Sequence, residues 1–210
     1  KRRERWGATD EELRRTLPGD ELIPEVRWAS THAITINANP EQVWPWIIQI
    51  GQGRGGFYSY QTLENLMGCK IQNADTILDE FQHPKVGDEI RMHPADTMPV
   101  FKIARIEPPH TFLLGGAPQY DEKLKITIGV TWLFYLEQKP LDTTRLIIRW
   151  RTFYSPNSFA NRMWFGPLLV ENLDFVMETR MMQGIKDRVE AKTISDDLNL
   201  TAKYQLPLRP

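Results

Sequence analysis

The sequence has a single cysteine, no long hydrophobic run and almost no net charge. Cys69 has no second cysteine with which to form a disulfide, which agrees with a reducing compartment. No segment approaches the roughly 20 consecutive apolar residues of a transmembrane helix. The 26 Lys and Arg nearly balance the 27 Asp and Glu, so electrostatics gives no reason to expect a nucleic-acid partner. We therefore expect a cytoplasmic protein that binds no nucleic acid.

The sequence also lacks the common metal and nucleotide motifs. Its four histidines, His32, His83, His93 and His110, are scattered, and no two have the close spacing that would bring them to one metal ion. The glycine-rich stretch at 51–56 lacks the Lys-Ser/Thr of a phosphate-binding loop. A Gly-x-Ser-x-Gly nucleophile motif is also missing. The sequence therefore predicts no metal site and no cofactor.

The length and the 41% apolar content suit one large domain with a substantial core. The basic run at residues 1–5 is typical of a solvated tail. Because the chain begins at Lys1 without a methionine, a segment such as a membrane anchor can precede it in the natural protein. Contact with a membrane is expected only through such a segment.

The first 67 residues predict short helices around one strand. Thr9 followed by Glu12 has the form of a capping box, which predicts a helix at about 10–16 within an N-terminal arm over residues 1–25. Residues 28–36 are largely β-branched or aromatic and predict a strand. Asn39 is expected to cap a helix that begins at Pro40, and a second helix is expected at 60–67.

Five further strands are expected at 89–92, 100–106, 111–114, 125–136 and 143–154, as an antiparallel meander. Residues 69–85, before the first of these strands, are polar and irregular and are expected to form a loop, with a helical turn at 74–78 as an alternative. Alternation in the two longest strands predicts two inward faces, made by Ile126, Ile128, Val130, Trp132, Phe134, Leu136, Leu146, Ile148, Trp150 and Tyr154. Arg145, Arg149 and Arg151 lie on the opposite face and are predicted to meet solvent, because unpaired guanidinium groups are costly to bury.

A helical pattern runs from about residue 158 to 192, with a kink or a new start at Gly166-Pro167. One apolar stripe on it is predicted to rest on the sheet: Leu169, Leu173, Val176, Met177, Met181 and Ile185. Glu171, Asp174 and Glu178 form a separate polar stripe. The main domain is thus predicted to span 26–195, followed by an extended tail at 196–210.

The run Arg54-Gly55-Gly56-Phe57-Tyr58-Ser59-Tyr60, continuing to Leu66, resembles bacterial proteins of the START-like (SRPBCC) superfamily. Ala74-Asp75, Val86-Gly87-Asp88, the segment at 6–12 and the Pro-Glu-x-Val-Trp-x-Trp run at 40–46 add to this resemblance. It implies an α+β helix-grip fold, in which a curved antiparallel sheet wraps around a long C-terminal helix and leaves a hydrophobic cavity. It implies no single function, since superfamily members include lipid carriers, receptors and aromatic cyclases.

The cavity expected from this fold would be lined by the inward sheet face and the long helix. Trp132 and Phe134 would form flat apolar walls, and Met177 and Met181 could adapt to ligand shape. For each of these four residues, an ordinary place in the core is an equally good interpretation.

Three polar residues follow the glycine-rich stretch. Tyr58 and Tyr60 could orient a ligand oxygen, or could simply be exposed. Glu64 lies one helical turn after Tyr60, and a carboxylate facing an apolar cavity would have a raised pKa and could transfer protons. The alternative is that Glu64 pairs with Arg54 or binds backbone amides.

Three hypotheses of function follow. The first is a non-enzymatic carrier or sensor of a hydrophobic small molecule, such as a lipid, polyketide or isoprenoid. The second is an enzyme of the cyclase, dehydratase or isomerase type, with Glu64 as the catalytic group. The third is a protein-interaction module whose cavity is filled by its own side chains.

Overall fold

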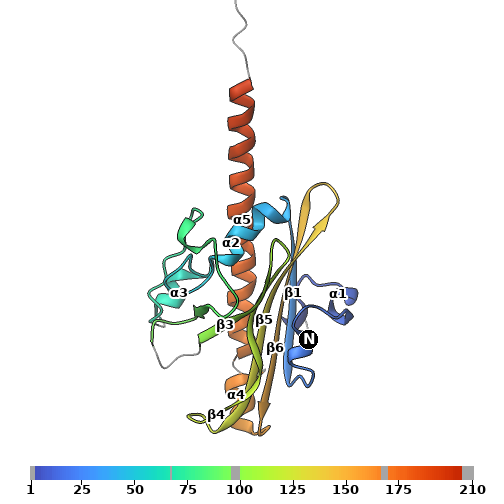
Figure 1. Ribbon diagram of the computed structural model, residues 1–210, viewed down its shortest axis with the longest axis vertical. Coiled ribbons are helices and arrows are strands. Elements are labelled where there is room, and N and C mark those ends of the chain that lie inside the picture. Colours follow the sequence, from blue (N-terminus) through green and yellow to red (C-terminus); the bar gives the residue numbers. More distant parts are fainter. Residues whose placement is uncertain (1–2, 67, 96–99, 167–169, 205–210) are drawn as a thin grey trace, which may run out of the picture.

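The computed structural model describes residues 3–66, 68–95, 100–166 and 170–204, with the backbone alone at 170–174 and 196–204. A six-stranded antiparallel sheet curves along a long C-terminal helix (Figure 1). The strands are β1 (Trp28–Ile36), β2 (Glu89–Arg91), β3 (Val100–Glu107), β4 (Thr111–Asp121), β5 (Ile126–Lys139) and β6 (Thr143–Ser155), in the spatial order β1-β6-β5-β4-β3-β2. This is the α+β helix-grip fold expected from the sequence.

The α-helices are α1 (Asp10–Arg14), α2 (Pro40–Ile48), α3 (Gln61–Leu66), α4 (Phe159–Phe165) and α5 (Val170–Tyr204), and the 3-10 turns are η1 (Arg3–Arg5), η2 (Asp20–Leu22) and η3 (Asp79–Phe81). The capping box of Thr9 and Glu12 is confirmed, and Asn39 caps α2 with Gln42 in the same way. The helical turn predicted at 74–78 is wrong, because the turn occurs at η3. The Gln49 side chain donates to the Thr76 carbonyl and accepts from the Leu78 N–H, and these bonds hold the segment in a non-helical conformation.

The register of the two longest strands confirms their predicted inward faces. Trp132 lies opposite Trp150, and Phe134 lies opposite Ile148. Leu136 and its partner Leu146 are fully buried. Strand β4 is longer than predicted, since its pairing with β5 continues beyond an irregularity between Gly116 and Gln119. Gly115 and Gly116, which follow the predicted end of the strand at residue 114, therefore lie within it.

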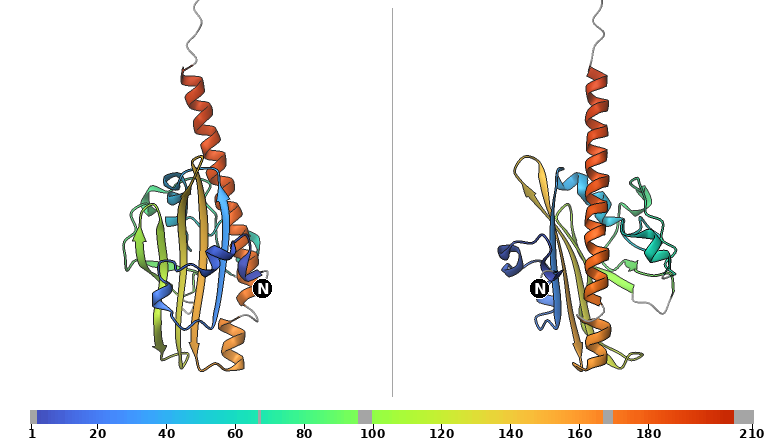
Figure 2. Two further views of the ribbon diagram at one scale, coloured as in Figure 1. Left: turned by 90° about the vertical axis from the view of Figure 1, so that its right-hand side faces the viewer. Right: turned by 180° about the vertical axis from the view of Figure 1, so that it is seen from behind.

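Helix α5 packs on the concave side of the sheet (Figure 2). Its buried side chains there are Glu178, Met181, Met182, Ile185 and Val189. Val176, predicted on this face, is 43% exposed, because it lies two residues, about 200° of helix rotation, from Glu178. Leu169 and the side chain of Leu173, also predicted on this face, lie outside the described part of the chain.

The extended tail predicted at 196–210 is wrong over 196–204, where α5 continues and projects beyond the sheet (Figures 1 and 2). The physical reason is that no proline or glycine interrupts this segment, and Pro207 is the first helix breaker after Gly184. Residues 205–210 lie outside the described part. Among the described residues, no helix has the length and apolar character needed to cross a membrane.

The N-terminal arm covers the face of the sheet opposite α5 (Figure 2), which overturns the prediction that Arg145, Arg149 and Arg151 face solvent. Arg149 is only 3% exposed. Its guanidinium donates to Asp20 Oδ2 at 2.6 Å and also to Thr31 Oγ1 and backbone carbonyls of the arm. Arg145 pairs with Glu12 at 2.7 Å, and Arg151 donates to the carbonyl of Ile23. Burial is tolerated because the arm supplies the missing partners.

Gly184 of α5 lies directly against the backbone of Tyr58, and a Cβ at this position would stand 2.2 Å from the Tyr58 carbonyl oxygen. Gly184→Ala should lower the free energy of unfolding by about 1–3 kcal/mol in urea denaturation, because steric strain exceeds the gain in helix propensity of about 1 kcal/mol. Gly116→Ala is the control, since a Cβ at Gly116 meets open space. Equal stability of the two variants would contradict the close contact.

Candidate functional site

Aromatic rings form a continuous row across the concave side of the sheet. In order they are Trp44, Phe112, Phe134, Trp132, Trp150 and Phe101, with neighbouring ring centroids 4.7–6.3 Å apart. Phe112 and Phe134 are fully buried, whereas Trp150 and Phe101 are only partly buried. The end of this aromatic row at Trp44 is therefore closed by packing, and the end at Trp150 and Phe101, the accessible end, is partly exposed.

Four of the residues predicted to bind a ligand lie on this concave side. Trp132, Phe134 and Met181 are at most 5% exposed and belong to the main core cluster. Met177 is half-buried, and its carbonyl oxygen accepts a hydrogen bond from Ser59 Oγ at 3.0 Å. This contact joins the segment before α3 to α5. Of the four, Met177 is the one placed where a ligand could reach it without repacking of the core.

The two tyrosines are not brought together. Tyr58 is buried, and its hydroxyl accepts from Gln49 Nε2 at 2.8 Å and donates to the Trp46 carbonyl at 3.2 Å. Burial raises the pKa of this hydroxyl. Tyr60 is 48% exposed. The hydroxyl of Tyr58 is thus engaged in the protein's own hydrogen bonds, and that of Tyr60 lies at the surface.

Glu64 has an unusual environment for a carboxylate. It is 4% exposed, and its Oε2 atom is buried with no hydrogen-bond partner. Burial raises its pKa from 4.5 to about 7. Arg54, the partner considered from the sequence, instead donates to the Ile48 carbonyl and stacks on Phe81. The nearby Cys69 thiol has its pKa raised by burial and by the charge of Glu64, so the two side chains are neighbours in the core.

This environment predicts a pH dependence of stability. The pKa of Glu64 is higher in the folded state, about 7 against 4.5, so folding favours the protonated form. The resulting stability is present below pH 4.5 and is lost as the pH rises to about 7. We expect a loss of about 1–3 kcal/mol across this range, measured by urea denaturation. Glu64→Gln should flatten this part of the profile, and an unchanged profile would contradict the assignment.

A buried polar network that the sequence did not indicate joins β1, β5 and α5. Glu178 Oε2 accepts from Trp132 Nε1 at 3.1 Å, and Glu178 Oε1 lies 2.6 Å from His32 Nδ1. The other ring nitrogen of His32 lies 2.6 Å from the Arg3 carbonyl oxygen. Both ring nitrogens therefore face acceptors, whereas a neutral imidazole has one N–H. His32 thus lies between the Glu178 carboxylate on α5 and a backbone carbonyl of the N-terminal arm.

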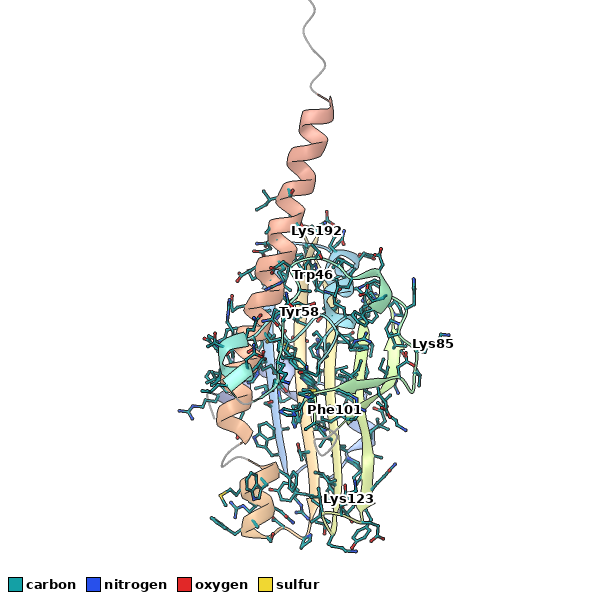
Figure 3. The ribbon with its side chains drawn as sticks, turned by 90° about the vertical axis from the view of Figure 1, so that its left-hand side faces the viewer. Trp46, Tyr58, Lys85, Phe101, Lys123 and Lys192 are labelled. Carbon is teal, nitrogen blue, oxygen red and sulfur yellow. The ribbon has the colours of Figure 1, made fainter. Side chains whose placement is uncertain are left out.

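A groove of about 710 Å³ lies between α2, the loop at 75–77 and α5. Its lining residues are Trp46, Asp75, Thr76, Ile77, Asp187, Arg188, Ala191 and Lys192. None of the seven predicted ligand-binding residues is among them. Tyr58 contacts two of the lining residues. The Arg188 guanidinium stacks on its ring at 5.0 Å, and the Trp46 ring packs edge-on against it at 5.8 Å; Figure 3 labels Trp46 and Tyr58. Within the described residues, no cluster of His, Cys, Asp or Glu could hold a metal ion.

The sequence matches no protein-family model and no curated protein. Solved structures with a similar fold include norcoclaurine synthase from Thalictrum flavum, at 12% identity and a TM-score of 0.44 over 79% of this chain and 95% of that one. They also include the self-sacrificing resistance protein CalC from Micromonospora echinospora, at 10% identity and a TM-score of 0.44 over 79% and 96% of the chains. A polyketide-cyclase-like protein from Corynebacterium glutamicum matches at 15% identity and a TM-score of 0.35 over 85% and 96%.

These similarities concern the fold alone. The helix-grip architecture is established by the strand order and the long C-terminal helix of the chain itself.

Proposed function

We propose that the protein binds a hydrophobic small molecule on the concave side of the sheet, at the accessible end of the aromatic row. The observation that carries this proposal is the partly buried pair of rings Trp150 and Phe101, and we assign Glu64, whose buried Oε2 has no hydrogen-bond partner, as the polar group of the site. Leaving a buried acceptor without a partner costs about 1–3 kcal/mol, and a hydroxyl or amine on a ligand would remove that cost. The ligand would therefore combine an apolar body with one hydrogen-bond donor.

Native mass spectrometry of protein purified without detergent, followed by organic extraction, would identify a bound molecule. A stoichiometric hydrophobic adduct with a hydroxyl or amine is the expected result. An adduct that Glu64→Gln retains at full occupancy would count against the role of Glu64. Protein free of any adduct, even after incubation with lipid and polyketide extracts, would favour an interaction module whose cavity is filled.

Met177→Trp tests the position of the ligand. The larger side chain should occupy the accessible end of the concave side and weaken binding of the extracted molecule by about tenfold or more, while the domain stays folded. Val176→Trp is the matched control, because Val176 is the preceding residue and is 43% exposed. Equal affinity of the two variants would exclude the concave side near Met177 as the site.

A second candidate function is proton-transfer catalysis of the cyclase, dehydratase or isomerase type. The pKa of about 7 at Glu64 favours it, because a general acid or base is most effective when its pKa lies near the working pH. This hypothesis predicts that Glu64→Gln abolishes turnover of the extracted molecule while its affinity changes only a few-fold. A carrier would show no turnover in either form.

A further inference from the structure

The groove between α2 and α5 has the size and the apolar floor of a small-molecule site. Its volume of about 710 Å³ falls within the range of roughly 300–1,000 Å³ that is typical of such sites. Ile77 and Ala191 supply apolar surface, and Trp46, which is 2% exposed, lies beneath them. No residue of this groove belongs to the concave site proposed above, so the two sites are structurally independent.

The charges along the groove leave an excess of hydrogen-bond donors. Asp75 accepts from Arg188 at 2.8 Å, and Asp187 lies 3.5 Å from Arg180. Both lining carboxylates are thus paired with arginines. Lys192 makes no side-chain hydrogen bond or ion pair with any described residue. Among the described residues, the groove therefore presents one ammonium group that has no ion-pair partner.

Arg188 is fixed in place and still has donors to spare. It bonds to the carbonyls of Ala74 and Gly184 and to the carboxylate of Asp75, and it stacks on Tyr58. These bonds use three of the five N–H groups of a guanidinium. A positioned guanidinium beside a free ammonium, above an apolar floor, is suited to an acid group attached to a hydrophobic body.

We propose that this groove is a second binding site, for an amphiphilic organic anion such as an aliphatic or aromatic carboxylate. The acid group lies between Lys192 and Arg188, and the apolar part lies on Ile77 and Ala191. Figure 3 places Lys192 and Trp46 on the same side of the molecule, along α5.

Isothermal titration with decanoate, below its micelle concentration, tests this assignment. Decanol, with the same chain length and no charge, should bind at least about tenfold more weakly. Lys192→Glu should weaken decanoate binding about tenfold or more and leave decanol unaffected. The control is Lys85→Glu, which makes the same change in net charge at an exposed lysine away from the groove (Figure 3).

A filling variant separates this site from the concave one. Ala191→Trp places a large side chain in the groove and should abolish decanoate binding, whereas Met177→Trp should leave it unchanged. The opposite pattern would place decanoate on the concave side and overturn the groove assignment. The assignment would also be overturned if wild-type protein bound no decanoate, or if the Lys192→Glu and Lys85→Glu variants bound it equally. Failure of the concave site would leave these expectations intact.

Discussion

Arg149→Met should lower the free energy of unfolding by about 3–5 kcal/mol, measured by urea denaturation. Methionine fills similar space, but it removes the guanidinium that binds the Asp20 carboxylate at 2.6 Å and two arm carbonyls. Asp20 then keeps only the longer contact with Arg151, at 3.4 Å. Removing one partner of a buried ion pair has a large effect because the other charge remains buried with less compensation. The loss should appear as detachment of the N-terminal arm as well as reduced stability.

The control for this variant is Arg105→Met on β3. Arg105 pairs with Glu21 at 2.7 Å, but the two side chains are 39% and 52% exposed, and such pairs contribute about 1 kcal/mol or less. Asp20→Asn combined with Arg149→Met should recover part of the loss, since it removes a buried carboxylate whose remaining cation, Arg151, lies 3.4 Å away. If Arg149→Met and Arg105→Met lowered the free energy of unfolding by the same small amount, the guanidinium of Arg149 would have to be solvated rather than buried.

Glu178→Leu should lower the free energy of unfolding by about 2–5 kcal/mol. The substitution keeps the bulk of the side chain but removes the acceptor of both Trp132 Nε1 and His32 Nδ1. Each buried donor left without a partner costs about 1–3 kcal/mol. Thermal and urea denaturation would both measure this loss, because Glu178 lies between the helix and the sheet.

Glu178→Gln is the matched control and tests whether the network needs a carboxylate. An amide can accept from Trp132 with its oxygen and donate to Nδ1 of a neutral His32, while the other ring nitrogen still donates to the Arg3 carbonyl. This variant should therefore remain within about 1 kcal/mol of the wild type. A loss as large as that of Glu178→Leu would show that the network requires the negative charge of the carboxylate.

Local sequence signals predicted most of the secondary structure. Thr9 and Asn39 are recognisable helix caps because the residues that complete their boxes lie three positions later. The inward faces of β5 and β6 were predictable because alternation is a property of each strand alone. The predicted exposure of Arg149 was wrong because its burial depends on residues far away in the sequence. Its partners in the arm lie up to 137 residues earlier in the chain, and no local sequence pattern indicates them.

The candidate site was less predictable than the fold. The sequence suggested that Glu64 could face a cavity, because it follows the glycine-rich stretch. That Glu64 Oε2 has no partner could not be predicted, because Arg54 binds the Ile48 carbonyl and stacks on Phe81 instead. Periodicity assigned Glu178 to a polar stripe. In the sequence, a glutamate that pairs with a distant histidine cannot be distinguished from a solvent-exposed glutamate. The groove at Lys192 gave no signal, since it forms where three separate segments meet.

The position of the N-terminal arm has a consequence for the order of folding. The arm comes early in the chain, yet its contacts with Arg145 and Arg149 span 129–138 residues. Contacts of such long range require closure of a large loop and form slowly. Glu12 and Asp20 cannot reach these arginines until β6, the last strand, has joined the sheet. We therefore expect residues 12–20 of the arm, although synthesised early, to be among the last to reach their native positions.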